Sequence, residues 1–252
     1  MGEIKINQPL GSIIFQAVKE FNLKKNLEIG SWDGTGATTC FIEGMKDFTE
    51  KSLTCLEIGK TKYNSLVKNV ERFPWVKCYN RSSVDCKKLI NIKFNDIWDS
   101  QFNPMIHFPN IDKEMVRRYY HDDIKLMKKY PHGFLEEDKT IYDSVLIDGG
   151  EFTGYLEFEL LKDRTNVFFL DDAFRSYKTN RVTHILDSDP DWECIGYAKA
   201  LEQVDWGLPP GTVITEGCNI PDNLLQEMLM YQESVRNGFA VFKRKEFIEN
   251  GG

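Results

Sequence analysis

The sequence predicts an α/β fold in which a mostly parallel sheet carries helices on both of its faces. Short apolar segments recur along the 252-residue chain, and several of them end in acidic or glycine-rich residues. Between these segments lie stretches with helical periodicity, such as residues 9–21 at the start of the chain. Strands that alternate with helices are typical of parallel sheets, which bind ligands at the carboxyl ends of their strands.

The most informative segment, residues 26–39 (NLEIGSWDGTGATT), joins an acidic strand end to a glycine-rich turn and a helix start. Gly30, Gly34 and Gly36 lack Cβ atoms, so the backbone can turn sharply and approach a ligand closely. A dinucleotide fold would read G-x-G-x-x-G around a pyrophosphate. The order here is instead Glu-x-Gly-x-x-x-Gly-x-Gly, which disfavours a dinucleotide.

This order resembles motif I of the class I S-adenosylmethionine (SAM) dependent methyltransferases. The resemblance implies a Rossmann-like seven-stranded sheet, mostly parallel, with an antiparallel last strand at residues 239–244 on the sheet edge. It also implies that SAM contacts the motif residues Glu28, Gly30, Ser31, Gly34 and Gly36. Glu28 suits SAM because that ligand carries an ammonium and a sulfonium group. An ordinary strand-to-loop turn is the structural alternative.

A second apolar strand, residues 52–58, closes on Glu57 and Ile58 about twenty residues after the glycines. A carboxylate can accept hydrogen bonds from both ribose hydroxyls, in SAM and NAD folds alike. Glu57 is therefore expected to bind ribose without choosing the cofactor. The alternative is a solvated glutamate at a strand end.

A third strand, residues 76–79, precedes the loop where the family places its adenine contacts. The family often has an acid at the position of Ser82, so the match is loose there. Adenine recognition is expected from Ser82 and Ser83, with Asp85 as a second choice. Capping of the next helix explains the two serines equally well.

Two further strands, residues 142–148 and 166–172, end in carboxylates on the same rim of the sheet. They resemble the I-D-G-x-H and L-D-D signatures of a subgroup of small-molecule and sugar O-methyltransferases, some of which need a divalent metal. Asp148 is then expected beside the SAM sulfonium, together with Asp171 and Asp172. The chain departs from the signature at Glu151, which stands where the subgroup usually has His.

The acidic cluster suggests both catalytic and metal-binding roles. The predicted catalytic residues are Asp148, Glu151 and Asp172, and the predicted metal ligands are Asp148, Asp171 and Asp172. Because several carboxylates in one pocket repel one another, either one stays protonated or a cation joins them. Oxygen ligands favour Mg²⁺ or Mn²⁺ over zinc. Helix capping by one aspartate of the pair is the alternative.

Composition and charge limit the partners. The net charge of −7 disfavours a nucleic-acid substrate, and no apolar run approaches the ~20 residues of a membrane span. Six cysteines without a C-x-x-C pair, and no signal peptide, favour a reduced cytoplasmic protein. We expect one domain over residues 1–252, as a monomer or homodimer, with insertions at about 87–139 and 205–236. The first insertion is expected to bind the acceptor through Arg117, Arg118, Tyr119 and His121.

Together these features predict a SAM-dependent O-methyltransferase whose acceptor is a small polar molecule, with a sugar, a glycan precursor or an anionic compound as the open choices. Two alternatives remain open at this point. An NAD-linked oxidoreductase or epimerase is disfavoured by the glycine spacing. A cofactor-binding protein that has lost its chemistry is favoured by Glu151 in place of His.

Overall fold

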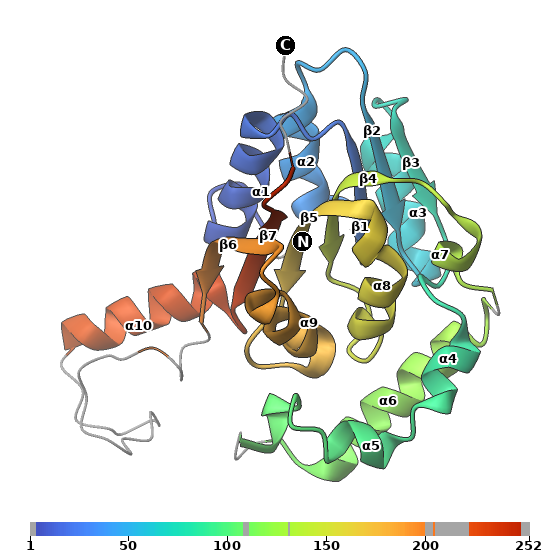
Figure 1. The fold of residues 1–252 in the computed structure, drawn as a ribbon, viewed down its shortest axis with the longest axis vertical. Helices are drawn as coiled ribbons and strands as arrows, with labels where there is room; N and C mark the ends of the chain where they lie inside the picture. The colour runs from blue at the N-terminus through green and yellow to red at the C-terminus, as the bar shows by residue number, and fades with distance from the viewer. Residues whose placement is uncertain (1–3, 108–110, 131, 200–203, 205–221, 248–252) are drawn as a thin grey trace.

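The computed structural model describes residues 4–107, 111–130, 132–199, 204 and 222–247. A seven-stranded sheet with the order β3-β2-β1-β4-β5-β7-β6 forms its centre (Figure 1). The strands are β1 (Lys25–Ile29), β2 (Ser52–Leu56), β3 (Val76–Tyr79), β4 (Tyr142–Ile147), β5 (Thr165–Asp171), β6 (Trp192–Ala198) and β7 (Phe239–Arg244). Strands β1 to β5 pair in parallel, and β7 is antiparallel to both neighbours. The predicted Rossmann-like, mostly parallel sheet is confirmed.

The expected place of the last strand was wrong. Strand β7 lies between β5 and β6, so β6 is the edge strand. The burial pattern explains this order, because four consecutive residues of β7, Phe239–Phe242, are buried. Such a strand needs neighbours on both sides, whereas β6 is largely half-buried or exposed and tolerates an edge.

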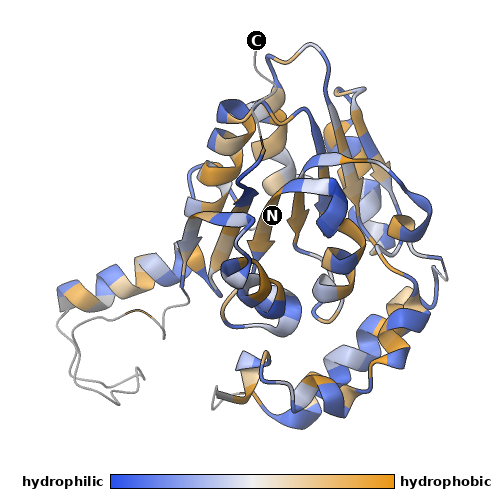
Figure 2. Ribbon diagram, in the orientation of Figure 1, coloured by the Kyte–Doolittle hydropathy of each residue, from blue (hydrophilic) through white to orange (hydrophobic). Residues whose placement is uncertain are grey.

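Helices cover both faces of the sheet, and the apolar strands lie between them (Figure 2). One face packs against α1 (Pro9–Glu20), α2 (Ala37–Met45) and α3 (Lys60–Val70). The other packs against α8 (Gly154–Leu161) and α9 (Tyr177–Ser188), with the 3₁₀ turn η2 (Lys162–Arg164) after α8. Alternate residues of β5 and β7 enter the two cores, as expected for strands buried on both faces.

The segment between β3 and β4 is helical, as expected for the first insertion. It contains α4 (Cys86–Asn91), α5 (Phe94–Trp98), η1 (Pro104–His107), α6 (Lys113–Met127) and α7 (Phe134–Glu137). Asp112 caps α6 by accepting a hydrogen bond from the Met115 N–H, and every third or fourth residue of the helix is buried. This pattern fixes which face of α6 turns toward the sheet.

The second predicted insertion is described only in part. Residues 205–221 lie outside the described residues, and the remainder forms α10 (Asp222–Val235). Figure 1 shows α10 projecting from the β6–β7 side of the sheet. Within the described part of the chain, no helix has the length and apolarity that a membrane crossing requires.

The strand register brings the predicted site residues to one rim. Ile29, at the end of β1, pairs with Leu56 of β2 and Ile147 of β4. The residues that follow these three strands therefore lie side by side, and Asp171 follows in register on β5.

Candidate functional site

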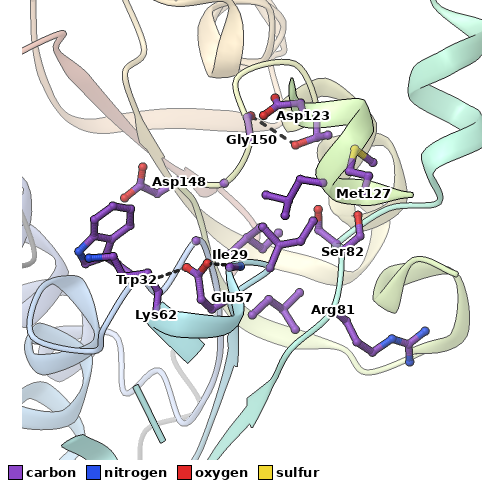
Figure 3. Close-up of a pocket in the computed structure, with 18 of the residues that line it drawn as sticks. Ile29, Trp32, Glu57, Lys62, Arg81, Ser82, Asp123, Met127, Asp148 and Gly150 are labelled. Atoms are coloured by element: carbon purple, nitrogen blue, oxygen red, sulfur yellow. Dashed lines mark hydrogen bonds between the residues drawn. The ribbon is translucent and has the colours of Figure 1, made fainter. Parts of the chain in front are cut away.

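A cavity of about 570 Å³ opens at this rim, at the carboxyl ends of β1, β2 and β4 (Figure 3). Its volume lies in the range of small-molecule sites, ~300–1,000 Å³. Six of the predicted site residues line it: Gly30, Glu57, Ile58, Ser82, Ser83 and Asp148. The wall also includes residues that the sequence did not single out, among them Trp32, Lys62, Asp123, Met127, Thr153 and Lys178.

Glu57 is held by the main chain. The Trp32 N–H donates to Oε2 (2.9 Å) and the Gly59 N–H donates to Oε1 (2.6 Å), so both carboxylate oxygens are oriented (Figure 3). Burial raises the pKa of Glu57 from its usual value, although these two N–H groups oppose the shift. Each oxygen keeps a lone pair, so the carboxylate can still accept two hydroxyl groups from a ligand.

Gly30 has a structural reason beyond ligand access. Its φ is +90°, and a Cβ there would lie 2.1 Å from the Asp148 carbonyl oxygen. A side chain would therefore push β1 from β4 before it met any ligand. Gly34, with φ +80°, packs similarly against Leu66 of α3, where a Cβ would lie 2.8 Å from Cδ1.

Glu28 lies beneath the turn rather than on the cavity wall. It is 1% exposed, and its Oε2 accepts hydrogen bonds from Thr38 Oγ1 (2.7 Å) and Cys55 Sγ (3.5 Å). Burial raises its pKa to about 7. Ser31 Oγ donates to the Glu28 carbonyl (3.4 Å), also below the surface.

Four predicted cofactor residues, Glu28, Ser31, Gly34 and Gly36, are thus absent from the cavity lining. They support the turn that presents Gly30 and Trp32, and their direct contact with a ligand stays a prediction. Trp32 has a φ of +52° and is 48% exposed, and the Lys62 ammonium lies 3.8 Å from the centre of its ring. Trp32 could have been recognised as a cavity residue from the sequence, because it is an aromatic residue inside a glycine-rich turn.

The predicted adenine end uses its serine hydroxyls internally. Ser82 Oγ donates to the Val84 carbonyl (2.7 Å), and Ser83 Oγ donates to Glu157 Oε1 (2.5 Å). Asp85, the second choice for adenine, caps α4 by accepting from the Lys87 N–H (2.8 Å), which is the role that the sequence allowed for the two serines. Both serines line the cavity, but their hydroxyl hydrogens are already used within the protein and are not available to a ligand.

Asp123, from the insertion helix α6, lines the same cavity. Its Oδ2 is buried and has no hydrogen-bond partner among the residues that the structure describes. Burial raises its pKa to about 6, against the effect of N–H groups from Glu151 and Phe152. Buried carboxylate oxygens without a partner are uncommon, so this oxygen is a candidate acceptor for a ligand N–H.

The insertion thus reaches the cavity through residues that were not expected. Arg117, Arg118, Tyr119 and His121 are outside its lining. Arg117, for example, pairs with Glu114 (2.9 Å) at the surface. No spacing signal marked Asp123, because its role depends on how α6 packs.

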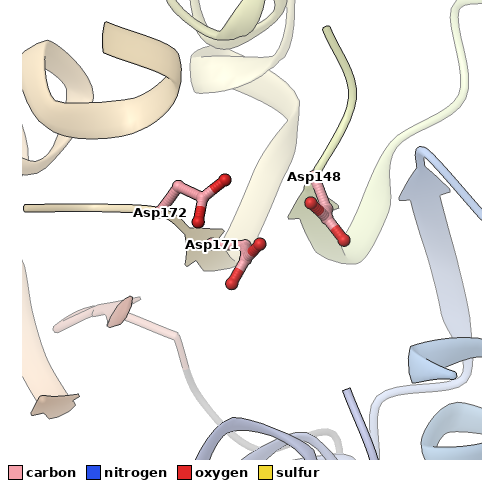
Figure 4. A group of neighbouring side chains, drawn as sticks. All are labelled: Asp148, Asp171 and Asp172. Carbon is pink, nitrogen blue, oxygen red and sulfur yellow. The ribbon is translucent and has the colours of Figure 1, made fainter. Parts of the chain in front are cut away.

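At the other end of the cavity, Asp148, Asp171 and Asp172 converge as predicted, with one carboxylate oxygen of each within 4.8 Å of the others (Figure 4). The unexpected member is Lys178, from the first turn of α9 and only 8% exposed. Its Nζ lies 2.9 Å from Asp148 Oδ1, 2.6 Å from Asp172 Oδ2 and 3.7 Å from Asp171 Oδ2. We call these four residues the acid–lysine cluster.

Charges within the cluster compensate one another. Burial opposes the charged form of Lys178, but the surrounding carboxylates outweigh it and hold its pKa well above the usual value. Burial likewise opposes ionisation of Asp172, but the Lys178 ammonium keeps that pKa below its usual value. Asp171 shows the opposite result, because burial and two neighbouring carboxylates raise its pKa well above normal.

Of the predicted catalytic residues, only Asp148 lines the cavity. Glu151 accepts a hydrogen bond from the Tyr177 N–H (3.1 Å), and burial raises its pKa to about 7 while Lys178 opposes the shift. Asp172 accepts from Asn237 Nδ2 (2.8 Å) as well as pairing with Lys178. Catalytic roles for Glu151 and Asp172 stay predictions.

The predicted Mg²⁺ or Mn²⁺ does not fit this arrangement. A metal ion bound by Asp148, Asp171 and Asp172 would lie beside the Lys178 ammonium, which already contacts the same oxygens. A divalent ion could therefore bind these oxygens only if the Lys178 side chain moved away or lost its proton, and its raised pKa opposes loss of the proton. From the sequence, the three carboxylates lacked a positive partner and suggested a metal ion. The sequence did not show that Lys178 lies among them.

The sheet order and the cavity at its rim match the class I methyltransferase fold. No family model and no curated protein matches the sequence. The structure resembles a "putative O-methyltransferase" from Klebsiella pneumoniae, with a TM-score of 0.51 at 10% identity, covering 93% of this chain and 79% of that one. It also resembles cofactor-bound Rv0187 from MTB, with a TM-score of 0.51 at 10% identity over 94% and 79% of the two chains. At such identities the likeness shows a shared fold, which is the one that motif I implied.

Proposed function

We propose that this protein is a SAM-dependent O-methyltransferase that acts on a small, uncharged, hydroxyl-bearing molecule, with sugars and glycan precursors as the leading class. The carrying observation is the cavity at the rim of β1, β2 and β4, in which Glu57 and Asp148 face one space. Glu57 is fixed there by two main-chain N–H groups, as a ribose-binding carboxylate needs to be.

In this proposal the ribose and the adenine of SAM lie in the cavity. Glu57 and Ile58 would hold the ribose, and Ser82, Ser83 and Met127 would flank the adenine. The unpartnered Asp123 Oδ2 would accept a hydrogen bond from the adenine amino group, which replaces the acid that the family often has at the position of Ser82.

The methyl group would then point toward the acid–lysine cluster. SAM, when bound, supplies an electrophilic methyl group on a sulfonium. The protein's own contribution is to hold an acceptor oxygen in line with that methyl group and to exclude water. At this end of the cavity, Asp148 is the lining carboxylate that would accept the proton from the acceptor hydroxyl.

The charge of this end favours a neutral acceptor over an anionic one. Three carboxylates surround one ammonium, so the cluster stays net negative even when Asp171 is protonated. A sulfonium is attracted to such a site, whereas a phosphate or carboxylate beside it is repelled. A cytoplasmic location, a single domain and a monomeric or homodimeric state belong to the same proposal.

Calorimetry with S-adenosylhomocysteine (SAH), the demethylated product of SAM, and with NAD tests the cofactor. We expect saturable SAH binding and none for NAD; the reverse would favour an oxidoreductase. Transfer of labelled methyl groups to a panel of neutral and phosphorylated sugars then tests the reaction. Binding of SAH without transfer to any neutral or anionic hydroxyl compound would favour a cofactor-binding protein without this chemistry.

A further inference from the structure

We propose that the Lys178 ammonium is the resident cation of the acid–lysine cluster and takes the place that a divalent metal ion would occupy. It contacts Asp148 and Asp172 at 2.9 and 2.6 Å and lies 3.7 Å from Asp171, so the one side chain reaches all three carboxylates. The cluster is therefore an internal ion-pair network and not a metal site.

The backbone holds Lys178 in this position. Ser176 Oγ caps α9 by accepting a hydrogen bond from the Lys178 N–H (3.0 Å). Helix α8 packs against the same turn so closely that a Cβ on Gly154 would lie 2.0 Å from the Lys178 carbonyl oxygen. Because two helices fix its backbone, the side chain, which is 8% exposed, enters the cluster from a rigid element.

Lys178 also lines the cavity wall. Two of its N–H groups are matched by Asp148 and Asp172, and the 3.7 Å separation from Asp171 is longer than a hydrogen bond. A ligand oxygen in the cavity can therefore reach the remaining N–H. This consequence rests on the proposed function: an acceptor oxygen beside the sulfonium would meet an N–H donor and not a Lewis acid.

Manganese binding, followed by the electron paramagnetic resonance signal of free Mn²⁺, tests the inference without an identified acceptor. The wild-type protein should show no saturable binding at millimolar Mn²⁺. Lys178→Met should release the three carboxylates and bind Mn²⁺ at least about tenfold more tightly, because oxygen-rich clusters suit this ion. The matched control is Lys162→Met, which removes a surface lysine paired with Glu159 (3.2 Å) and should behave as the wild type.

Micromolar Mn²⁺ binding by the wild-type protein that Asp171→Asn abolishes would overturn the proposal. So would a Lys178→Met variant that is folded by circular dichroism and gains no affinity. The wild-type titration needs no variant, so the proposal stays testable if the substitution prevents folding. SAH titrated into the same samples reports on the proposed function separately, since Mn²⁺ exclusion and cofactor binding can fail independently.

Discussion

The two ends of the cavity hold their carboxylates in different ways. At the proposed ribose end, Glu57 is oriented by two main-chain N–H groups, from Trp32 and Gly59. At the other end, the lining residue Asp148 and, behind it, Asp172 are held by the side chain of Lys178. The first arrangement leaves a carboxylate open to a ligand, whereas the second matches charges within the protein.

The two kinds of carboxylate should therefore have different roles: one binds a ligand, and the other balances charge within the protein. A carboxylate held by neutral N–H groups keeps its full charge and its spare lone pairs, so it is suited to hydroxyl recognition. A carboxylate paired with an ammonium is less available to coordinate a metal ion directly, although the net negative cluster still favours a nearby cation over an anion. Substitutions at the ribose end should therefore change cofactor affinity, and those at the acid–lysine end should change which ions the site accepts.

Glu57→Ala should give the largest effect on the ribose end. It removes the acceptor for two hydroxyl groups and leaves the Trp32 and Gly59 N–H groups without their partner. Hydrogen bonds to a charged group contribute about 1.5–3 kcal/mol each, so SAH affinity should fall at least about 100-fold by calorimetry. Glu71→Ala, at an exposed position after α3, is the control and should bind as the wild type. A folded Glu57→Ala variant with unchanged affinity would contradict the ribose assignment.

Asp123→Ala should have a smaller effect, about tenfold on SAH affinity, because one hydrogen bond to the adenine amino group is lost. Its exposed neighbour provides a matched control, and Asp122→Ala should change nothing. The inosine analogue of SAH lacks the amino group, so it should bind the wild type and Asp123→Ala equally. Since the pKa of Asp123 is raised to about 6, wild-type affinity for SAH should also decline below pH 6. An equal loss for both ligands would mean that Asp123 only supports the wall.

The sequence predicted several strands and the residues at their ends well. Strands β3 and β7 have the predicted bounds, and the acid after β2 faces the cavity as motif spacing required. These features follow from apolar periodicity and from the register of parallel strands, both of which are local or repeat along the chain. The place of β7 between β5 and β6 did not follow, because it depends on strand pairing across the whole sheet.

The positions of side chains that depend on helix packing could not be predicted in the same way. Lys178 lies six residues past Asp172 and reads as an ordinary helix residue until α9 is docked on α8. Asp123 reads as one of two adjacent acids until the packing of α6 turns only one of them inward. Glu28 was expected at the ligand, but Thr38 and Cys55 draw it beneath the turn. In each case tertiary packing, not residue type, decides the role.

Residues near the two ends should also make the free energy of unfolding depend on pH in opposite ways. Glu28, below the ribose end, has its pKa raised to about 7 by burial. The folded protein therefore holds a proton there that the unfolded chain releases near pH 4.5, and the stability that this proton confers is lost as pH rises through 7. Asp172 behaves oppositely, since its lowered pKa confers stability that is lost only in acid.

Glu28→Gln isolates the first of these terms. The amide keeps an oxygen for the Thr38 hydroxyl but cannot ionise, so the fall in unfolding free energy between pH 5 and 8 should shrink by about 2–3 kcal/mol in urea titrations. A residual fall should persist, because burial also raises the pKa values of Glu151 and Glu157 to about 7. The acid limb, governed by residues such as Asp172, should be unchanged. If the variant instead loses the acid limb and keeps the full decline above pH 5, Glu28 is ionised in the folded protein, and a direct contact with a cationic ligand becomes the better account of its role.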